Sequence, residues 1–239
     1  MARPLTAVAH RGDPYRHREN TLASLRSALE RGADAVEVDV RLTRDGVPVL
    51  LHDRTLRRLW GHDLPVASLT AAGLRDLTDG GVPALARALE VTAGHRVLLD
   101  LPGDAAGSPR ALRRVLEAVR EAGAEDRVYW SGAASTLLAL RAAAPSAELA
   151  LTWTTSAPPR AGLLAAVRPR WLNYRFGLVT AELVRRLHAE GYLVSAWTAD
   201  TRRSMRGLAR AGVDAVTTNR IDVLAALRDA RRPVPDAAP

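Results

Sequence analysis

Residues 27–53 read SALERGADAVEVDVRLTRDGVPVLLHD, and this stretch contains the clearest strand pattern of the sequence. In the segment 35–41 valines alternate with acidic residues, which predicts a β-strand because successive side chains point to opposite faces. A second apolar run at 47–51 follows after only the short segment TRDG. Parallel strands need a connection of about a dozen residues or more, so this run must fold back as a hairpin with its turn at Asp45 and Gly46.

The same strand pattern recurs along the chain and alternates with amphipathic helices rich in Ala, Leu and Arg. Strands are expected at 6–10, 35–41, 96–101, 127–131, 148–153, 170–174, 193–198 and 214–218. Helices are expected near 20–31, 70–77, 83–92, 109–122, 135–143, 160–167, 180–190, 201–211 and 221–230. Eight strands that are each followed by helix predict a TIM (β/α)8 barrel, an α/β fold that commonly takes about 250 residues.

The chain has 239 residues, which suits one barrel domain. We expect that domain to span residues 1–230. The hairpin and the helices after it, roughly residues 42–95, would form an insertion after the second strand, at the end of the barrel where loops carry the chemistry. Residues 231–239 are Pro-rich and lack periodicity, so we expect a disordered tail there.

The composition excludes several kinds of chemistry. The chain contains no cysteine, so it has neither disulfides nor thiolate nucleophiles or thiolate metal ligands. It also contains no lysine, and all 34 basic residues are arginine, which excludes Schiff-base catalysis. Any bound metal must therefore be held by oxygen atoms or imidazole nitrogens.

The formal net charge of +8 could attract phosphorylated substrates or nucleic acid. The arginines are, however, spread along the chain and interleaved with acids on predicted helices, as in SPRALRRVLEAVREAG. Only five Trp, four Tyr and one Phe are available for base stacking, so we expect solvated helix faces and no nucleic-acid partner.

No apolar run approaches the roughly 20 residues that a membrane span requires. The first residues, MARPLTAVAH, lead directly into the first strand and lack the apolar region of a secretion signal. We therefore expect a cytoplasmic protein without integral membrane association.

Polar and charged side chains gather where the predicted strands end. These residues are His10, Arg11, Glu37, Asp39, His52, Asp53 and Asp100. The carboxyl ends of the strands of a barrel meet at one rim, and the active sites of such barrels lie there. We therefore expect these side chains to converge on one site.

Glu37 and Asp39 share one face of their strand, and the valines between and beside them take the other face. Two carboxylates side by side in a barrel lumen repel each other, and a divalent cation relieves that repulsion. Asp100, on the next predicted barrel strand, would add a third oxygen ligand, and Mg²⁺ or Ca²⁺ prefers such ligands. The alternative is that buried arginines pair with these carboxylates in a structural ion network.

His10 and His52 would flank this metal site. An imidazole titrates near neutral pH, so the two could act as general base and general acid on opposite sides of a reacting phosphorus. A histidine at a strand end could also be purely structural. Arg11 could donate two hydrogen bonds to phosphate oxygens, or it could instead pair with Glu19 or Glu37.

Glu19, Asn20 and Thr21 begin the first predicted helix. Asn20 or Thr21 could cap the free N–H groups of that helix, which would explain the asparagine without any further role. Glu19 and Asn20 also lie on the loop after the first strand, from which either could reach the metal site.

Four short motifs resemble the glycerophosphodiester phosphodiesterase family. HRG at 10–12 ends the first strand, ENT at 19–21 opens a helix, EVD at 37–39 lies on the second strand and HD at 52–53 follows the hairpin. Their order and spacing match those of the family, and residues 27–53 resemble it almost throughout. VSAWTAD at 194–200 and LARAGVDAVTTNR at 208–220 resemble its last two strands.

This resemblance implies a TIM barrel that hydrolyses glycerophosphodiesters to sn-glycerol 3-phosphate and an alcohol. It also implies a role in lipid and glycerol metabolism, and Mg²⁺ or Ca²⁺ as the cofactor. The implied catalytic pair is His10 and His52, the metal ligands are Glu37, Asp39 and Asp100, and the supporting residues are Glu19 and Asn20. Arg11 would bind the phosphate, and Trp197 would line the glycerol side of the pocket. We expect a small-molecule substrate and a monomer or homodimer.

Three motifs depart from the pattern of the family. The third metal ligand is usually Glu in an E-x-K motif, whereas this chain has Asp100 and, in place of the lysine, Pro102. Arg175 could replace the lost positive charge. PALAR at 83–87 stands where the family tends to have PTLEE, and Asp200 stands where an Asn usually follows WT by two positions.

These departures leave an alternative open, a catalytically degraded barrel that binds phosphodiesters without turnover. A further alternative is headgroup cleavage on larger lysophospholipids, for which Leu59, Trp60 and Leu64 in the insertion could form an apolar lip. The first prediction remains the metal-dependent phosphodiesterase, because the four motifs retain the histidine pair and the acidic residues.

Overall fold

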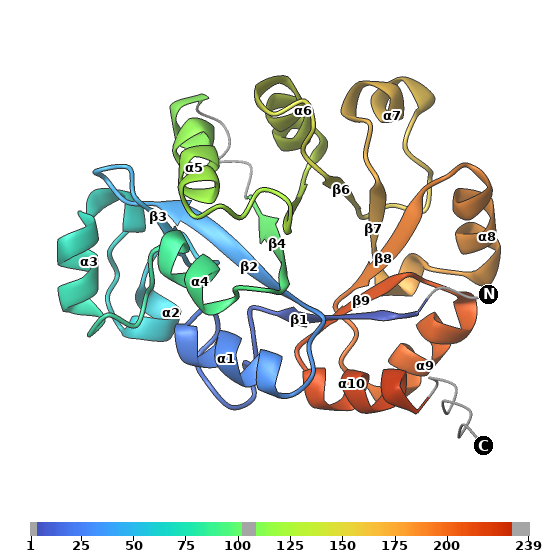
Figure 1. Ribbon diagram of the computed structural model, residues 1–239, viewed down its shortest axis with the longest axis horizontal. Helices are drawn as coiled ribbons and strands as arrows, with labels where there is room; N and C mark the ends of the chain where they lie inside the picture. Colours follow the sequence, from blue (N-terminus) through green and yellow to red (C-terminus); the bar gives the residue numbers. More distant parts are fainter. Residues whose placement is uncertain (1–3, 102–108, 231–239) are drawn as a thin grey trace, which may run out of the picture.

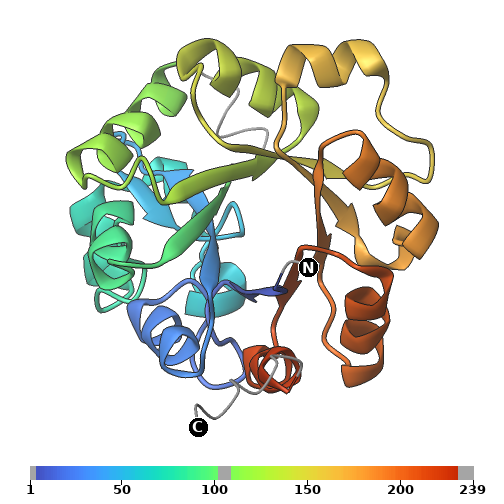
Figure 2. The same cartoon turned by 45° about the vertical axis from the view of Figure 1, so that its right-hand side comes forward.

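The computed structural model describes residues 4–101 and 109–230, which form a ring of strands surrounded by helices (Figure 1). Pro102 and the predicted tail at 231–239 lie outside the described residues. Figure 2 shows the ring of strands with the helices around its outside.

Eight of the described strands run parallel to one another: β1 (Thr6–His10), β2 (Ala35–Leu42), β4 (Arg96–Asp100), β5 (Val128–Gly132), β6 (Leu149–Trp153), β7 (Trp171–Arg175), β8 (Leu193–Trp197) and β9 (Ala215–Thr218). Each pairs with the next around the barrel, and β1 pairs with both β9 and β2, which closes the ring. The predicted TIM barrel is confirmed, and the strands begin and end within one residue of the positions expected from the sequence.

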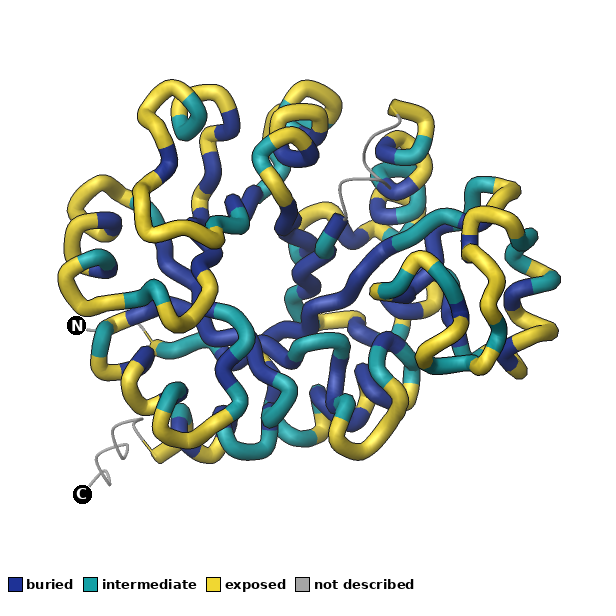
Figure 3. The backbone as a smooth tube through the Cα atoms, turned by 180° about the vertical axis from the view of Figure 1, so that it is seen from behind, coloured by how far each residue is buried: buried dark blue, intermediate teal, exposed yellow. Residues whose placement is uncertain are grey.

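The helices that cover the outside are α1 (Leu22–Glu30), α4 (Leu85–Val91), α5 (Pro109–Glu121), α6 (Ala134–Ala143), α7 (Ala161–Val167), α8 (Ala181–Ala189), α9 (Arg202–Ala211) and α10 (Ile221–Asp229). On all of them except α7, which buries only Val167, the buried residues recur at helical spacing, as Leu112, Val115 and Val119 do on α5. An apolar face of these helices therefore packs on the strands. Figure 3 shows buried backbone along the ring of strands and exposed backbone on the outer sides of the helices.

The lumen of the barrel contains two layers of opposite character. Near the amino ends of the strands, inward side chains form an apolar cluster of Val8, Ala35, Leu98, Tyr129, Ala150, Trp171, Leu193 and Ala215. Two residues further along the same strands the side chains again point inward, and there they are polar: His10, Glu37, Asp100, Ser131, Thr152, Asn173, Ser195 and Thr217. The apolar layer therefore closes one end of the lumen, and the polar layer forms the floor of the other.

The segment after β2 folds back on it as a hairpin, in which β3 (Pro48–Leu50) pairs antiparallel with β2. Gly46 has a φ of 82°, in the left-handed region that this tight turn uses and that glycine adopts without steric cost. The chain then forms α2 (Arg57–Trp60), the 3-10 turn η1 (Val66–Ser68) and α3 (Ala71–Leu77), which enclose a small apolar cluster. A further 3-10 turn, η2 (Phe176–Leu178), follows β7. The sequence did not predict α2, η1 and η2, because such short turns show no helical periodicity.

The loop between β1 and α1 lies close against its own helix. Gly12 has a φ of 88°, and a Cβ atom there would lie 2.4 Å from Oγ of Ser24 and 2.6 Å from its carbonyl carbon. Only glycine fits, so packing explains this part of the HRG motif. Thr21 caps α1 by accepting a hydrogen bond from the backbone N–H of Ser24 over 3.2 Å. The cap is therefore Thr21, and the alternative that Asn20 caps the helix is wrong.

The outer surface carries interleaved charges. Arg114 pairs with Glu117 on α5, and Arg170 pairs with Glu148 at the amino ends of β7 and β6. Surface pairs of this kind contribute about 0–1 kcal/mol each, and they add little to the stability of the fold. Over residues 4–101 and 109–230, no helix has the length and apolar character that a membrane crossing needs.

Candidate functional site

The carboxyl ends of β2 and β4 bring three carboxylates together in the lumen. Ligand oxygen atoms of Glu37, Asp39 and Asp100 lie within 4.8 Å of one another. Glu37 is 5% exposed and Asp39 is 4% exposed, whereas Asp100 is half-buried. In the part of the chain that the structure describes, no other three His, Asp or Glu side chains meet in this way. The three acids that the sequence predicts as metal ligands are therefore neighbours in space.

Burial and mutual repulsion shift the pKa values of this acid cluster. Burial and the negative charges of Asp39 and Asp100 raise the pKa of Glu37 well above its usual range. Burial and the charge of Asp39 raise the pKa of Asp100 to about 6, although Ser131 Oγ donates a hydrogen bond to Asp100 Oδ1 over 2.8 Å, which acts in the opposite direction. Such a cluster is stabilised by binding a proton or a cation.

Arg11 and Asn20 lie in the loop after β1, and their backbones have left-handed φ angles of 56° and 57°. The side chains of both residues contact Asp39. Arg11 Nε lies 2.9 Å from Asp39 Oδ2, and Asn20 Nδ2 donates to the same oxygen over 2.8 Å. The backbone N–H of Arg11 also donates to Glu37 Oε2 over 3.1 Å. Arg11 Nη1 pairs with Glu19 over 2.9 Å. The guanidinium of Arg11 thus pairs with Asp39 and Glu19, and only its backbone reaches Glu37.

One guanidinium does not balance the acid cluster. Asp39 has Arg11 as a partner, whereas among the described residues no guanidinium contacts Glu37 or Asp100. The cluster therefore keeps an excess of about two negative charges if all three groups are ionised, which is the charge of one divalent cation. The alternative of a structural ion network holds for Asp39 and not for the other two acids.

His10 ends β1, and only 19% of its side chain is exposed. Its Nδ1 lies 2.7 Å from Oδ1 of Asn219, and its Nε2 lies 3.8 Å from Oε2 of Glu37. Burial and the positive charge of Arg11 lower the pKa of His10 below the usual value of histidine. A neutral imidazole at this position is able to accept a proton.

His52 follows β3, and 49% of its side chain is exposed. Its Nδ1 lies 2.8 Å from Oδ1 of Asp53. Arg58 on α2 donates to Asp53 Oδ2 over 2.6 Å and to Glu19 Oε1 over 2.6 Å. The hydrogen bond from Arg58 is the main reason that the pKa of Asp53 is lowered to about 2. Arg58 thus ties the hairpin that carries His52 to the loop that follows His10.

Trp197 and Arg175 end the neighbouring strands β8 and β7. These two strands lie across the ring from β4 and β2. Trp197 is half-buried, and its Nε1 donates to the carbonyl oxygen of Asn173 over 3.3 Å. Arg175 is exposed. Both residues therefore lie at the same rim as the acid cluster, on its far side.

The sequence did not predict the roles of Arg58, Asn219 and Asp200. Asn219 directly follows β9, and residues at that end of barrel strands often take part in the site, so its position was a usable signal. Asp200 accepts hydrogen bonds from the backbone N–H and from Nδ2 of Asn219, each over 2.8 Å. For Arg58 there was no signal, because α2 is too short to show which face points to the site.

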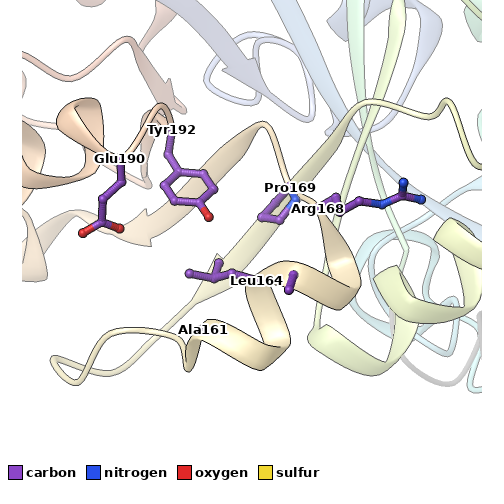
Figure 4. Close-up of a pocket in the computed structure, with 7 residues that line it drawn as sticks. Ala161, Leu164, Arg168, Pro169, Glu190 and Tyr192 are labelled. Carbon is purple, nitrogen blue, oxygen red and sulfur yellow. The ribbon is translucent and has the colours of Figure 1, made fainter.

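A separate groove lies at the opposite end of the barrel. It has a volume of about 630 Å³ and is lined by Ala161, Leu164, Ala165, Arg168, Pro169, Glu190 and Tyr192 (Figure 4). Arg168 and Pro169 precede β7, and Glu190 and Tyr192 precede β8, so the groove lies at the amino ends of these strands. It contains none of the residues predicted to act, and the acid cluster remains the candidate site.

A known family covers most of the chain. The model of the glycerophosphoryl diester phosphodiesterase family matches residues 10–223. Over 225 residues the chain is 26% identical to a glycerophosphodiester phosphodiesterase of Caldanaerobacter subterraneus, covering 89% of this chain and 93% of that protein. Over 238 residues it is 31% identical to the probable glycerophosphodiester phosphodiesterase 2 of Mycobacterium tuberculosis, covering 91% and 88%.

Solved structures show the same likeness. A phosphodiesterase from Oleispira antarctica, in complex with the product sn-glycerol-3-phosphate, matches with a TM-score of 0.83 at 26% identity and covers 95% of this chain and 97% of its own. A glycerophosphodiester phosphodiesterase from Thermotoga maritima matches with a TM-score of 0.80 at 24% identity, covering 93% and 98%, and supports the fold alone.

Proposed function

Because the chain belongs to the glycerophosphoryl diester phosphodiesterase family, we propose that it hydrolyses glycerophosphodiesters to sn-glycerol 3-phosphate and an alcohol. One observation carries this proposal: His10 and the hairpin that carries His52 lie beside a cluster of three carboxylates, of which Glu37 and Asp39 are buried. His10 Nε2 lies 3.8 Å from Glu37 Oε2, and the backbone N–H of Leu51, which directly precedes His52, donates to the carbonyl oxygen of Asp39 over 3.1 Å. Acid–base groups and a cation site thus adjoin one another at the rim.

We propose that Glu37, Asp39 and Asp100 hold Mg²⁺ or Ca²⁺. The donor set fits such an ion, because it offers hard oxygen ligands close together with more negative charge than the guanidinium of Arg11 balances. When bound, the cation would neutralise charge that develops on the phosphate. Asn20 and Arg11 would keep Asp39 in place, which is the supporting role proposed for this loop.

The two histidines would move the protons. One would take a proton from water or from the neighbouring hydroxyl of the substrate, and the other would protonate the leaving alkoxide. Attack by water gives glycerol phosphate directly, whereas attack by the glycerol hydroxyl passes through a cyclic phosphate. Asp53, itself held by Arg58, would orient the ring of His52.

Arg11, Arg175 and Trp197 would bind the substrate. Arg11 Nε and Nη1 are paired with Asp39 and Glu19, and we assign its Nη2 to a phosphate oxygen. Arg175, across the ring from the acid cluster, would supply a second positive charge. Trp197 would pack against the glycerol moiety. We propose a small-molecule substrate and a monomer or homodimer that works in the cytoplasm.

The test is hydrolysis of glycerophosphocholine, glycerophosphoethanolamine and glycerophosphoglycerol by the purified protein, in chelator and with each divalent ion. We expect glycerol 3-phosphate to be released only with Mg²⁺ or Ca²⁺, as a coupled dehydrogenase assay would measure. Substrate binding by calorimetry without product would contradict the proposal and favour a degraded barrel that only binds phosphodiesters. Product release in chelator would contradict the role of the cation alone.

A further inference from the structure

A chain of hydrogen bonds runs from Asp200 through Asn219 to His10. Asn219 Nδ2 donates to Asp200 Oδ2 over 2.8 Å, and Asn219 Oδ1 lies 2.7 Å from His10 Nδ1. Asp200 follows β8, Asn219 follows β9 and His10 ends β1. These three strands are neighbours in the ring, so the chain follows the rim from strand end to strand end.

Asp200 can only accept hydrogen bonds from its neighbours in this series. Its Oδ1 accepts from Thr218 Oγ1 over 3.1 Å and from the backbone N–H of Asn219 over 2.8 Å, and its Oδ2 accepts from Asn219 Nδ2. An ionised carboxylate has no donor to offer. Asn219 must therefore turn its NH₂ group toward Asp200 and its carbonyl oxygen toward His10. The charge of Asp200 decides an amide orientation that would otherwise be ambiguous.

An acceptor at 2.7 Å from Nδ1 requires that this nitrogen of a neutral His10 carries the proton. Nε2 is then unprotonated, and it is the ring nitrogen on the side of Glu37. The carboxylate of Glu37 is the group that would favour the opposite tautomer. Its Oε2 lies 3.8 Å from Nε2, which is too long for a hydrogen bond, so the shorter contact with Asn219 decides.

We propose that Asp200 and Asn219 are positioning residues that hold His10 in the tautomer protonated at Nδ1, so that Nε2 acts as the proton acceptor in the reaction. The expected effect of these residues on turnover rests on the proposed function. The tautomer of His10, in contrast, is a property of the protein that can be measured without any substrate. The proposal also gives a role to the carboxylate at position 200, because an amide there could present either a donor or an acceptor to Asn219.

The variant Asp200→Asn should reverse the direction of the hydrogen bonds between position 200, Asn219 and His10. The oxygen of the new side chain would stay with Thr218 Oγ1 and the backbone N–H of Asn219, because two donors are satisfied there. Its NH₂ group would then face Asn219, which must turn its oxygen to position 200 and its Nδ2 to His10. The proton of His10 moves to Nε2 in consequence. We expect kcat to fall about 10²-fold with KM little changed.

The double variant Asp200→Asn, Asn219→Asp should restore the pattern with the two roles exchanged. The carboxylate at position 219 would accept from the amide at position 200 and from Nδ1 of His10. We expect kcat to recover to within about tenfold of the wild type, whereas Asn219→Asp alone sets two carboxylates face to face and should not recover. Rescue by the reciprocal exchange is not expected if Asp200 only stabilises the fold.

The tautomer is read directly from the ¹⁵N NMR shifts of the imidazole ring, in Mg²⁺-loaded protein at mildly alkaline pH, where imidazole is neutral. The signals of His10 are those that disappear in His10→Gln. We expect a proton on Nδ1 in the wild type and in the double variant, and on Nε2 in Asp200→Asn. A wild-type His10 protonated at Nε2 would overturn the proposal, even if the variants failed to fold.

Two further variants separate this proposal from the proposed function. Asp126→Asn, at an exposed site before the amino end of β5, is the matched control and should change neither kcat nor the tautomer. If His10→Ala keeps full turnover, the catalytic role of His10 is wrong, while the NMR result still tests its tautomer. If His10→Ala is inactive but a folded Asp200→Asn keeps full turnover and a proton on Nδ1, only the positioning role is wrong.

Discussion

The two histidines at the rim are held in different ways. His10 ends a strand of the barrel, is mostly buried, and contacts the neutral amide of Asn219. His52 follows the hairpin, is half exposed, and contacts the carboxylate of Asp53, with which it forms an ion pair when its ring is protonated. One side of the site is thus part of the barrel, and the other is carried by an insertion and tied back by Arg58.

The barrel and the insertion supply different properties to the site. The parallel pairing of β1 with β2 and β9 sets the strand ends around His10, so that its mostly buried ring contacts residues held by the barrel. His52 is held through ion pairs between loops, because Arg58 pairs both with Asp53, which contacts the ring, and with Glu19. A buried imidazole with a lowered pKa, as at His10, suits the acceptor of a proton.

Removal of either histidine should have the strongest effect on turnover. His10→Ala and His52→Ala should each lower kcat by about 10²–10⁴-fold, in line with the usual contribution of a general acid or base. Both proteins should fold, because His52 is half exposed and His10 borders the open end of the lumen. Steady-state release of glycerol 3-phosphate measures the loss, and circular dichroism checks the fold. A variant with full turnover would remove its side of the site from the mechanism.

Asp100→Asn tests the acid cluster that both sides share. The folded-state pKa of Asp100, about 6, exceeds the value of about 3.9 for an unfolded aspartate. The folded chain therefore binds more protons between these pH values, so the metal-free protein loses stability as pH rises through this window. The amide removes this loss, and above about pH 6 the metal-free variant should be more stable by about 1–3 kcal/mol.

The same variant should gain less stability than the wild type when Mg²⁺ or Ca²⁺ is added, because one oxygen ligand has lost its charge. Thermal unfolding with and without cation, across the pH window, measures both effects. Asp126→Asn, whose side chain is exposed far from the cluster, serves as the control. Equal stabilisation by the cation in Asp100→Asn and the wild type would argue against Asp100 as a ligand.

Arg58→Ala tests the tie on the side of His52. Without the hydrogen bond from Arg58, Asp53 loses the main cause of its low pKa and its fixed position beside His52. We expect kcat to fall about tenfold, as is usual for a residue that orients a catalytic group, with the tautomer of His10 unchanged. Arg57→Ala is the matched control, since its exposed side chain lies 3.8 Å from the exposed Asp63. Equal kinetics of the two variants would contradict the positioning role of Arg58.

The barrel and the acid cluster were predictable because their signals are local. Alternating side chains mark each strand, and the rule that strand ends meet at one rim brings Glu37, Asp39 and Asp100 together without any knowledge of packing. The same rule places Asn219 at the rim. It does not say which side chain the amide contacts, because His10 lies 209 residues away in sequence and the contact depends on how β9 pairs with β1.

Other features depend on backbone detail that side-chain patterns do not carry. Asn20 and Thr21 are both common cap residues. Only the structure shows that Asn20 has a left-handed φ of 57° and that its side chain bonds to Asp39 instead of capping α1. Arg58 lies on a helix of four residues, where no periodicity tells which way a side chain points. The partners that hold the site were therefore harder to predict than the groups proposed to act in it.

Two helix caps, Thr21 on α1 and Thr180 on α8, allow a comparison in which we expect only small changes. Each accepts a hydrogen bond from the N–H three residues later, over 3.2 Å from Ser24 and 3.1 Å from Leu183. Thr21→Ala and Thr180→Ala should each cost about 1 kcal/mol of the free energy of unfolding, which chemical denaturation measures. Only Thr21→Ala should also lower kcat/KM, by about two- to fivefold, because Asn20 directly precedes it and holds Asp39. If both variants lose stability and neither loses activity, the loop itself sets the position of Asn20. The close packing of Gly12 on Ser24 would allow this. The cap of α1 would then contribute nothing to the site.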